Sequence, residues 1–224
     1  MASSAFLPLF PLSSVLFPGV PIQLHIFEER YKSMIQACLQ TEQDFGVVLI
    51  EEGREALGPL ARTHHHGTTA QILKVQPLPE GRMNLVAIGF QRFRILSVDR
   101  EGAPFLRGEV KFEEIPEPSS ADNRAATALL PLVQQYVELI ADTRDPGHFI
   151  DFARLPRDAR ALSYAAAYLL HVPQFQKQQL LELTNPAELI AGVCRMYTTQ
   201  IELLKIVQRG GLQPPGGPGG VSLN

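Results

Sequence analysis

The chain has 224 residues, of which 45% are hydrophobic and 19% are charged. This composition excludes an intrinsically disordered chain and predicts one large or two small globular domains. The 20 basic and 23 acidic side chains leave a net charge of −3, which excludes a strong general attraction to nucleic acid or anionic lipid but leaves a local basic patch open.

The first two dozen residues are apolar but do not follow the pattern of a secretory signal peptide. No lysine or arginine precedes Arg30, and Pro8, Pro11, Pro18 and Pro21 interrupt every apolar run. A signal peptide needs a basic start followed by a continuous apolar stretch. No part of the sequence reaches the roughly 20 uninterrupted apolar residues of a membrane-spanning helix. We therefore expect a cytoplasmic protein without a membrane partner.

Short segments that alternate apolar and polar residues fill the first half of the chain. Turn residues separate them, as at Pro79–Gly81 and Glu101–Ala103, which is typical of an antiparallel meander or a small barrel. We expect strands over Phe6–Leu12, Val20–His25, Phe45–Ile50, Thr68–Gln76, Asn84–Phe90, Phe93–Val98 and Phe105–Phe112.

One segment of this β-rich half has helical spacing. Apolar residues recur along residues 27–39, and Glu28 and Glu29 stand in the first turn, where carboxylates favour the helix dipole. We expect this helix to pack across the mouth or side of the barrel. The two cysteines, Cys38 and Cys194, lie far apart in helical segments, so we expect no disulfide and read both as buried or half-buried hydrophobes.

The segment Glu113–Arg124 is rich in proline, serine and charge, and it predicts a linker. It divides a β-rich domain over residues 1–115 from a helical bundle over residues 122–209. Pro131 indicates a kink or a late helix start. We expect bundle helices over Ala125–Ile140, Asp158–Leu170 and Gln174–Leu183.

The last helix has the clearest start. Asn185 suits the N-cap, Pro186 the first helical position, and Glu188 has capping-box spacing. The helix is expected to run to Arg209 with one apolar stripe, which permits a homodimer without requiring it. The remaining residues, 210–224, are dominated by glycine and proline and are expected to be disordered.

Three adjacent histidines suggest a metal site at first sight. In an extended segment, His64 and His66 would face the same side and could share a zinc or copper ion. No third ligand lies nearby in the sequence. We therefore favour a polar loop that leads into the strand at Thr68, and we expect no metal or other cofactor.

Two arginines suggest a nucleic-acid surface as an alternative. Arg92 and Arg94 alternate with Phe93 and Ile95, so a strand would present both guanidinium groups on one face, where they could bind phosphate. An RNA-binding module of this kind would lose affinity steeply with added salt. We favour a structural role for the pair.

Four stretches of the chain resemble the Lon protease N-terminal domain family. They are PLFPLSSVLFPGVPIQLHIFEERYKSMIQACL at Pro8–Leu39, HGTTAQILKV at His66–Val75, NLVAIGFQRFRILSV at Asn84–Val98 and VPQFQKQQLLELTNPAELI at Val172–Ile190. The resemblance implies an α+β fold in which a PUA-like β-barrel-type domain precedes a helical bundle with a long last helix.

The sequence lacks the motifs of the family's ATPase and protease modules. It contains no G-x-x-x-x-G-K-[ST] phosphate loop and no G-x-S-x-G nucleophile elbow. We therefore expect no enzymatic activity and no catalytic residue in this chain.

The resemblance implies recognition of unfolded or misfolded polypeptides, in a substrate-recognition or adaptor role related to Lon-type proteolysis. A separate protease or chaperone would then carry out the energy-dependent steps. Leu16, Phe17, Pro18 and Val20 lie in a proline-fixed turn between the first two strands, and preorganisation there would lower the cost of keeping an apolar patch open. We expect these four residues to contact the client.

Overall fold

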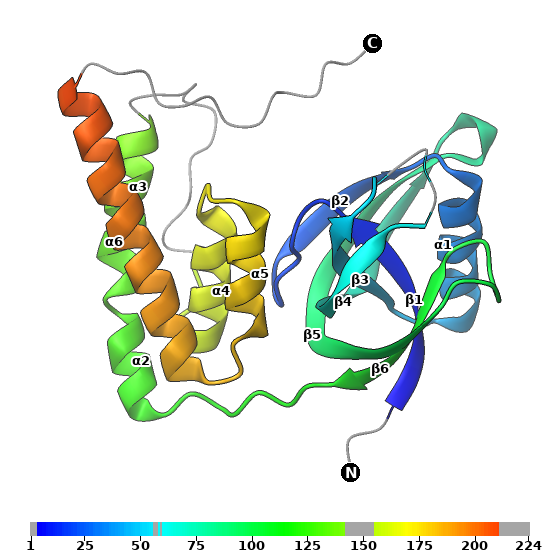
Figure 1. Ribbon diagram of the computed structural model, residues 1–224, viewed down its shortest axis with the longest axis horizontal. Helices are drawn as coiled ribbons and strands as arrows, with labels where there is room; N and C mark the ends of the chain where they lie inside the picture. Colours follow the sequence, from blue (N-terminus) through cyan, green and yellow to red (C-terminus); the bar gives the residue numbers. More distant parts are fainter. Residues whose placement is uncertain (1–3, 56–57, 59, 142–154, 211–224) are drawn as a thin grey trace.

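The computed structural model describes residues 4–55, 58, 60–141 and 155–210. The expected glycine- and proline-rich tail lies outside the described residues, apart from Gly210. Figure 1 shows the strands on one side of the molecule and α2–α6 on the other, joined by an extended segment from β6 to α2. The strands and helices of the first part are β1 (Ser4–Leu12), β2 (Pro21–Ile26), α1 (Glu29–Thr41), β3 (Phe45–Glu52), β4 (Arg62–Pro77), η1 (Pro79–Gly81), β5 (Met83–Asp99) and β6 (Leu106–Phe112).

Five of the strands close into a barrel. The sheet order is β2-β5-β4-β3-β1-β6, and β6 also pairs with β5, which closes the ring. β2 pairs with the first half of β5, outside the closed ring. The expectation of an α+β protein with a small barrel is confirmed, but β1 and β3 pair in parallel, which a simple meander does not contain.

Two strand predictions need correction. The separate strands expected over Asn84–Phe90 and Phe93–Val98 form one continuous strand, β5, because Arg92 between them still pairs with Thr68 of β4. The histidine triplet does not form a loop, since β4 already begins at Arg62. Its pairing with β3 is irregular between Val48 and Ile50.

The barrel interior is a small, closely packed apolar cluster. Four of the five barrel strands, β1, β3, β5 and β6, contribute side chains to it. The packing is tight enough to require glycine at two positions of the wall. A Cβ atom added to Gly46 would lie 2.6 Å from the Phe93 ring, and one added to Gly67 would lie 2.7 Å from it. The interior residues are Leu7, Leu9, Val48, Phe93, Ile95, Leu106 and Val110.

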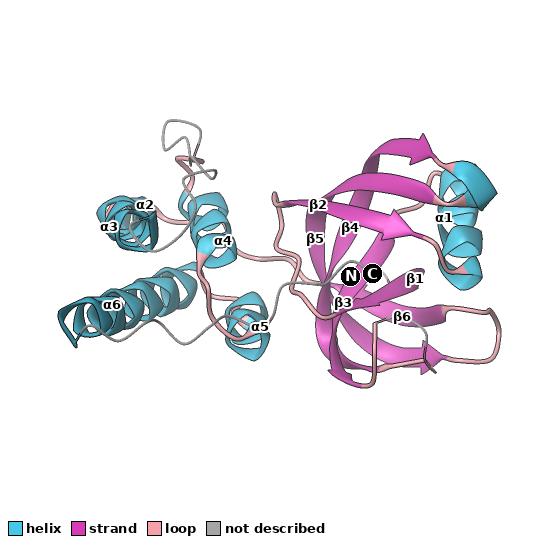
Figure 2. Cartoon of the chain, turned by 90° about the horizontal axis from the view of Figure 1, so that it is seen from above, coloured by secondary structure: helices cyan, strands magenta, loops and turns pink. Residues whose placement is uncertain are grey.

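The second part of the chain contains five helices among its described residues. Figure 2 shows them on one side of the barrel, with α1 on the opposite side. None of the helices in the described part of the chain has the length and apolar character needed to cross a membrane. The helices are α2 (Ser120–Ala126), α3 (Leu129–Ala141), α4 (Ala159–Leu169), α5 (Gln174–Glu182) and α6 (Pro186–Gly210).

The helix starts follow local sequence signals, although one was missed. The single helix expected over Ala125–Ile140 is instead two helices, α2 and α3, which are separated at Thr127 and Ala128. α2 begins at Ser120, because Ser119 and Asp122 form a reciprocal capping box. Pro131 lies in the first turn of α3, where its missing N–H costs no helical hydrogen bond. Asn185 caps α6, since its Oδ1 accepts a hydrogen bond from the Ala187 N–H at 2.9 Å.

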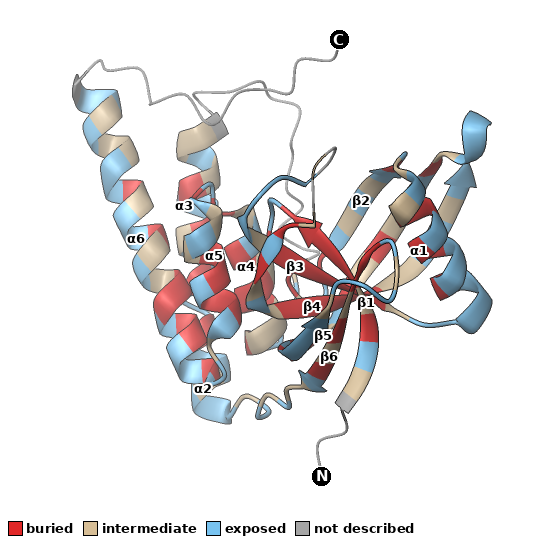
Figure 3. Cartoon of the chain, turned by 45° about the vertical axis from the view of Figure 1, so that its right-hand side comes forward, coloured by how far each residue is buried: buried red, intermediate tan, exposed pale blue. Residues whose placement is uncertain are grey.

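The helices and the barrel share one apolar core. The apolar stripe of α6 is buried against α3 and α4, and the Tyr197 hydroxyl donates to the Ala166 carbonyl at 2.8 Å. Across the junction, the rings of Phe17 and Tyr164 stack with centroids 5.7 Å apart. Figure 3 shows buried residues running from the strands into α4 and α6. The two parts therefore bury apolar surface against each other.

Candidate functional site

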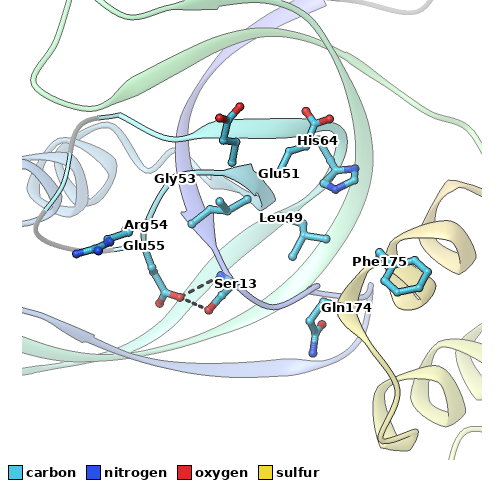
Figure 4. Close-up of a pocket in the computed structure, with 11 residues that line it drawn as sticks. Ser13, Leu49, Glu51, Gly53, Arg54, Glu55, His64, Gln174 and Phe175 are labelled. Carbon is cyan, nitrogen blue, oxygen red and sulfur yellow. Dashed lines mark hydrogen bonds between the residues drawn. The ribbon is translucent and has the colours of Figure 1, made fainter. Parts of the chain in front are cut away.

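A pocket of about 550 Å³ opens where the barrel meets α5 (Figure 4). Strands β3 and β4, residues 53–55 after β3 and Ser13 after β1 form one side, and the N-terminal end of α5 forms the other. Ligand-binding pockets of proteins commonly have volumes of about 300–1,000 Å³. We call this pocket the junction cleft. Its lining residues are Ser13, Leu49, Ile50, Glu51, Glu52, Gly53, Arg54, Glu55, His64, Gln174 and Phe175.

The α5 side of the junction cleft presents an aromatic ring to solvent. Phe175 is 54% exposed, although it lies near the buried Leu49 at the cleft wall. Gln174, beside it in sequence, fixes the start of α5 to the barrel, because its Oε1 accepts a hydrogen bond from the Val15 N–H at 3.1 Å. The ring is therefore held at the cleft by a fixed backbone rather than by a loose loop.

The barrel side of the junction cleft is acidic. Glu51 and Glu52 both pair with the exposed Arg62, at 3.6 and 3.1 Å. Glu55 accepts hydrogen bonds from both the N–H and the hydroxyl of Ser13, which are drawn as dashed lines in Figure 4. Exposed ion pairs of this kind contribute little to stability, so a polar ligand can replace the Arg62 contacts at small cost.

The expected client patch is not exposed in this structure. Leu16, Phe17 and Val20 are buried and Pro18 is half-buried. The turn folds inward because α4 covers it, with Phe17 against Tyr164. The buried Thr68 hydroxyl also donates to the Leu16 carbonyl at 2.7 Å. The prediction of an exposed patch at these four residues is therefore wrong for this conformation.

The structure separates the two arginines of the alternative hypothesis. The Arg92 side chain is completely buried and its Nη2 lies 2.7 Å from Glu113 Oε2. Its Nη1 donates to the Leu183 carbonyl. Arg94 is exposed. A phosphate group cannot reach both guanidinium groups, so Arg92 and Arg94 do not form the expected RNA surface.

Arg92 belongs to a polar cluster at the barrel–helix junction. His66 Nε2 lies 3.3 Å from Glu113 Oε1, and His66 Nδ1 lies 3.8 Å from Glu182 Oε1. Burial by itself raises the pKa of Glu113, but hydrogen bonds from His66 and Arg92 and the charge of Arg92 lower it from 4.5 to about 2. Glu113 is therefore ionised at all physiological pH values.

Residues 6–198 match the profile of the family described as the ATP-dependent protease La (LON) substrate-binding domain. This chain belongs to that family. It is 28% identical to the Lon protease of Paraburkholderia phytofirmans over 96% of its length. It is also 28% identical, over 88% of its length, to a LON peptidase N-terminal domain and RING finger protein of Schizosaccharomyces pombe. The matches cover 27% and 46% of these two relatives.

Solved structures show the same fold. The crystal structure of a Lon N-terminal domain protein from Xanthomonas campestris matches 84% of this chain and 95% of its own, with 27% identity and a TM-score of 0.62. The N-terminal domain of a Mycobacterium avium complex Lon protease matches 87% of this chain and 98% of its own, with a TM-score of 0.65 at 19% identity.

The three adjacent histidines of this Lon substrate-binding domain lie in different surroundings in the described part of the chain. No group of three or more histidine, cysteine or carboxylate side chains there is placed to hold a metal ion. His64 lines the junction cleft, His65 is exposed and His66 joins the polar cluster. The free Cys38 is buried and the free Cys194 is half-buried, as expected.

Sequence reasoning missed Phe175 as a site residue. A signal was available, because Phe175 is the only aromatic residue in the otherwise polar run Gln174–Gln179. The buried face of α5 is formed by Lys177, Gln178 and two leucines, which leaves the ring of Phe175 off that face. An aromatic residue on the polar side of a short helix indicates a surface contact.

Proposed function

We propose that this chain is a non-catalytic polypeptide-binding module that holds apolar segments of unfolded or misfolded proteins in the junction cleft. The observation that carries the proposal is the half-exposed Phe175 at a pocket large enough for a client side chain. Membership of a substrate-binding family supports it. The role would be substrate recognition or adaptor function related to Lon-type proteolysis, with a separate protease or chaperone performing the energy-dependent steps.

The cleft predicts weak and reversible binding of each segment. Burying one large apolar side chain contributes about 1.5–3 kcal/mol, and association itself costs several kcal/mol. One side chain in the cleft therefore gives little affinity by itself. Backbone contacts or several segments of one client must add to it, which suits a module that captures and releases chains.

The test is a titration of the purified protein with a fluorescently labelled unfolded polypeptide and, separately, with a labelled single-stranded RNA, each at low and moderate salt. We expect saturable polypeptide binding that survives moderate salt. Binding of RNA alone, with a steep salt dependence, would contradict the proposal.

A matched pair of variants tests whether the polypeptide binds in the junction cleft. Phe175→Ala removes a ring that is 54% exposed, and Phe6→Ala removes one that is 53% exposed on β1, outside the cleft lining. We expect Phe175→Ala to weaken polypeptide binding about fivefold to thirtyfold, equivalent to about 1–2 kcal/mol. Phe6→Ala should leave the affinity unchanged. Equal effects of the two variants would exclude the junction cleft as the binding site.

A further inference from the structure

β2 is an edge strand of the sheet, and one of its two sides has no neighbouring strand. Within the described part of the chain, β2 pairs with β5 and with no other strand. The backbone groups on its second side therefore point away from the sheet. An unpaired strand edge is a template on which another extended chain can pair.

The register of β2 shows which of its backbone groups point outwards. The Gly89 N–H of β5 donates to the Val20 carbonyl at 2.9 Å, and the pairing continues in the same register to the end of β2. Facing residues of an antiparallel pair alternate between bonded and non-bonded pairs. The residues of β2 that bond to β5 are therefore Ile22, Leu24 and Ile26. Gln23 and His25 direct both their N–H and their carbonyl groups outwards.

The outward side of β2 lacks the charges that protect most exposed strands. Edge strands are commonly blocked by lysine or other charged side chains, but β2 has the sequence PIQLHI, without Lys, Arg, Asp or Glu. The His25 ring is held towards β5, with its Nδ1 2.8 Å from Asn84 Oδ1. No backbone carbonyl of a described residue accepts a hydrogen bond from the Gln23 or His25 N–H. We call this side of β2 the free edge.

The side chains of β2 indicate which kind of segment fits the free edge. An added strand continues both faces of the sheet, because its side chains also alternate between them. On one face it lies beside the exposed Gln23 and His25. On the other face it lies beside Ile22 and Leu24, which are half-buried and pack against the main core. A segment in which polar and apolar residues alternate suits both faces, and such segments become exposed when a β-rich protein unfolds.

We propose that the free edge of β2 binds an extended client segment by strand addition, as a second polypeptide-binding site in addition to the junction cleft. The inference rests on the proposed function for the class of client, but not on the cleft, whose lining contains no residue of β2. Main-chain hydrogen bonds provide affinity for clients of many sequences. Two sites that hold one unfolded chain give a higher avidity than either site alone.

Amide hydrogen exchange followed by NMR tests the free edge in the wild-type protein. Without a ligand, the Gln23 and His25 amides should exchange faster than the Leu24 amide, because only Leu24 donates to β5. The probe is a short peptide in which valine and threonine alternate, with a lysine at each end for solubility. Saturation with this peptide should slow exchange at Gln23 and His25 at least about fivefold. Unchanged exchange at both amides in the presence of bound peptide would overturn the proposal.

Gln23→Pro and Gln23→Ala form a matched pair of variants. Both remove the Gln23 side chain, but only proline removes the outward N–H, and the hydrogen bonds to β5 come from the neighbouring residues. We expect Gln23→Pro to weaken binding of the valine–threonine peptide about threefold to tenfold and Gln23→Ala to leave it unchanged. Equal affinities of the two folded variants would contradict strand addition.

The same peptide separates the free edge from the junction cleft. Phe175→Ala should leave binding of the valine–threonine peptide unchanged, because the peptide has no large side chain for the cleft. If Phe175→Ala weakens binding of the unfolded polypeptide and Gln23→Pro changes neither ligand, the cleft stands and the free edge is excluded. The reverse result excludes the cleft and supports the free edge. A dimer in sedimentation that Gln23→Pro dissociates and the peptide does not would assign the edge to a second copy of the chain and overturn the proposal.

Discussion

Truncation of Phe17 to alanine is expected to destabilise the whole fold, because its ring links the barrel to the helices. The side chain is fully buried and stacks on Tyr164 with centroids 5.7 Å apart. Loss of its apolar burial costs about 1.5–3 kcal/mol and loss of the aromatic pair about 0.5–1.5 kcal/mol. With the cavity that remains, the free energy of unfolding should fall by about 3–5 kcal/mol.

The assay is urea unfolding followed by circular dichroism at fixed pH and salt. A loss of this size lowers the unfolding midpoint by about 1–3 M urea. The double variant Phe17→Ala with Tyr164→Ala should lose less than the sum of the two single losses, by about 0.5–1.5 kcal/mol, because the rings contact each other. Phe6→Ala, at an exposed position, should change the free energy of unfolding by about 0.5 kcal/mol at most. The reasoning would be refuted if Phe17→Ala lowered the free energy of unfolding by less than about 1 kcal/mol and also weakened client binding. That result would indicate that the Phe17 ring is exposed and contacts the client.

Further changes test other parts of the structure. Gly67→Ala should destabilise the protein by about 1–3 kcal/mol in the same assay, because its new methyl group overlaps the Val47 carbonyl oxygen and meets the Phe93 ring. An unchanged midpoint would show that the barrel wall has room for a side chain at this position. The pKa of Glu113 is depressed in the folded state, so its stabilising contribution is present above about pH 4.5 and is lost as the pH falls towards 2. Glu113→Gln should therefore flatten the acid limb of the stability curve, and parallel acid limbs for variant and wild type would contradict the ion cluster. Burial raises the pKa of the Cys38 thiol to about 11, so thiol reagents at neutral pH should modify half-buried Cys194 first and Cys38 only on unfolding. Equal modification rates in the native protein would contradict the burial of Cys38.

The order and type of most elements could be predicted from the sequence because the signals are local. Period-2 segments, the turn at Pro79–Gly81 and the Asn185 cap depend on neighbouring residues only. The start of α2 could also have been predicted, since Ser119 and Asp122 have the spacing of a capping box. The proline- and serine-rich composition around them pointed to a linker instead.

The candidate site could not be predicted in the same way, because its geometry depends on distant residues. Phe17 turns inward only because Tyr164, far along the chain, covers it. Arg92 is buried only because Glu113 and the Leu183 carbonyl neutralise and bind its guanidinium group. Alternation along a strand tells which residues share a face, but it does not tell what lies against that face.

The most direct test of the central claim is a map of amide chemical shifts of the ¹⁵N-labelled protein during titration with an unfolded polypeptide at moderate salt. We predict that the largest changes fall on the amides around Phe175, His64 and Leu49, which line the junction cleft. Changes confined to the Arg94 face of the barrel, or no changes at saturating polypeptide, would contradict the account.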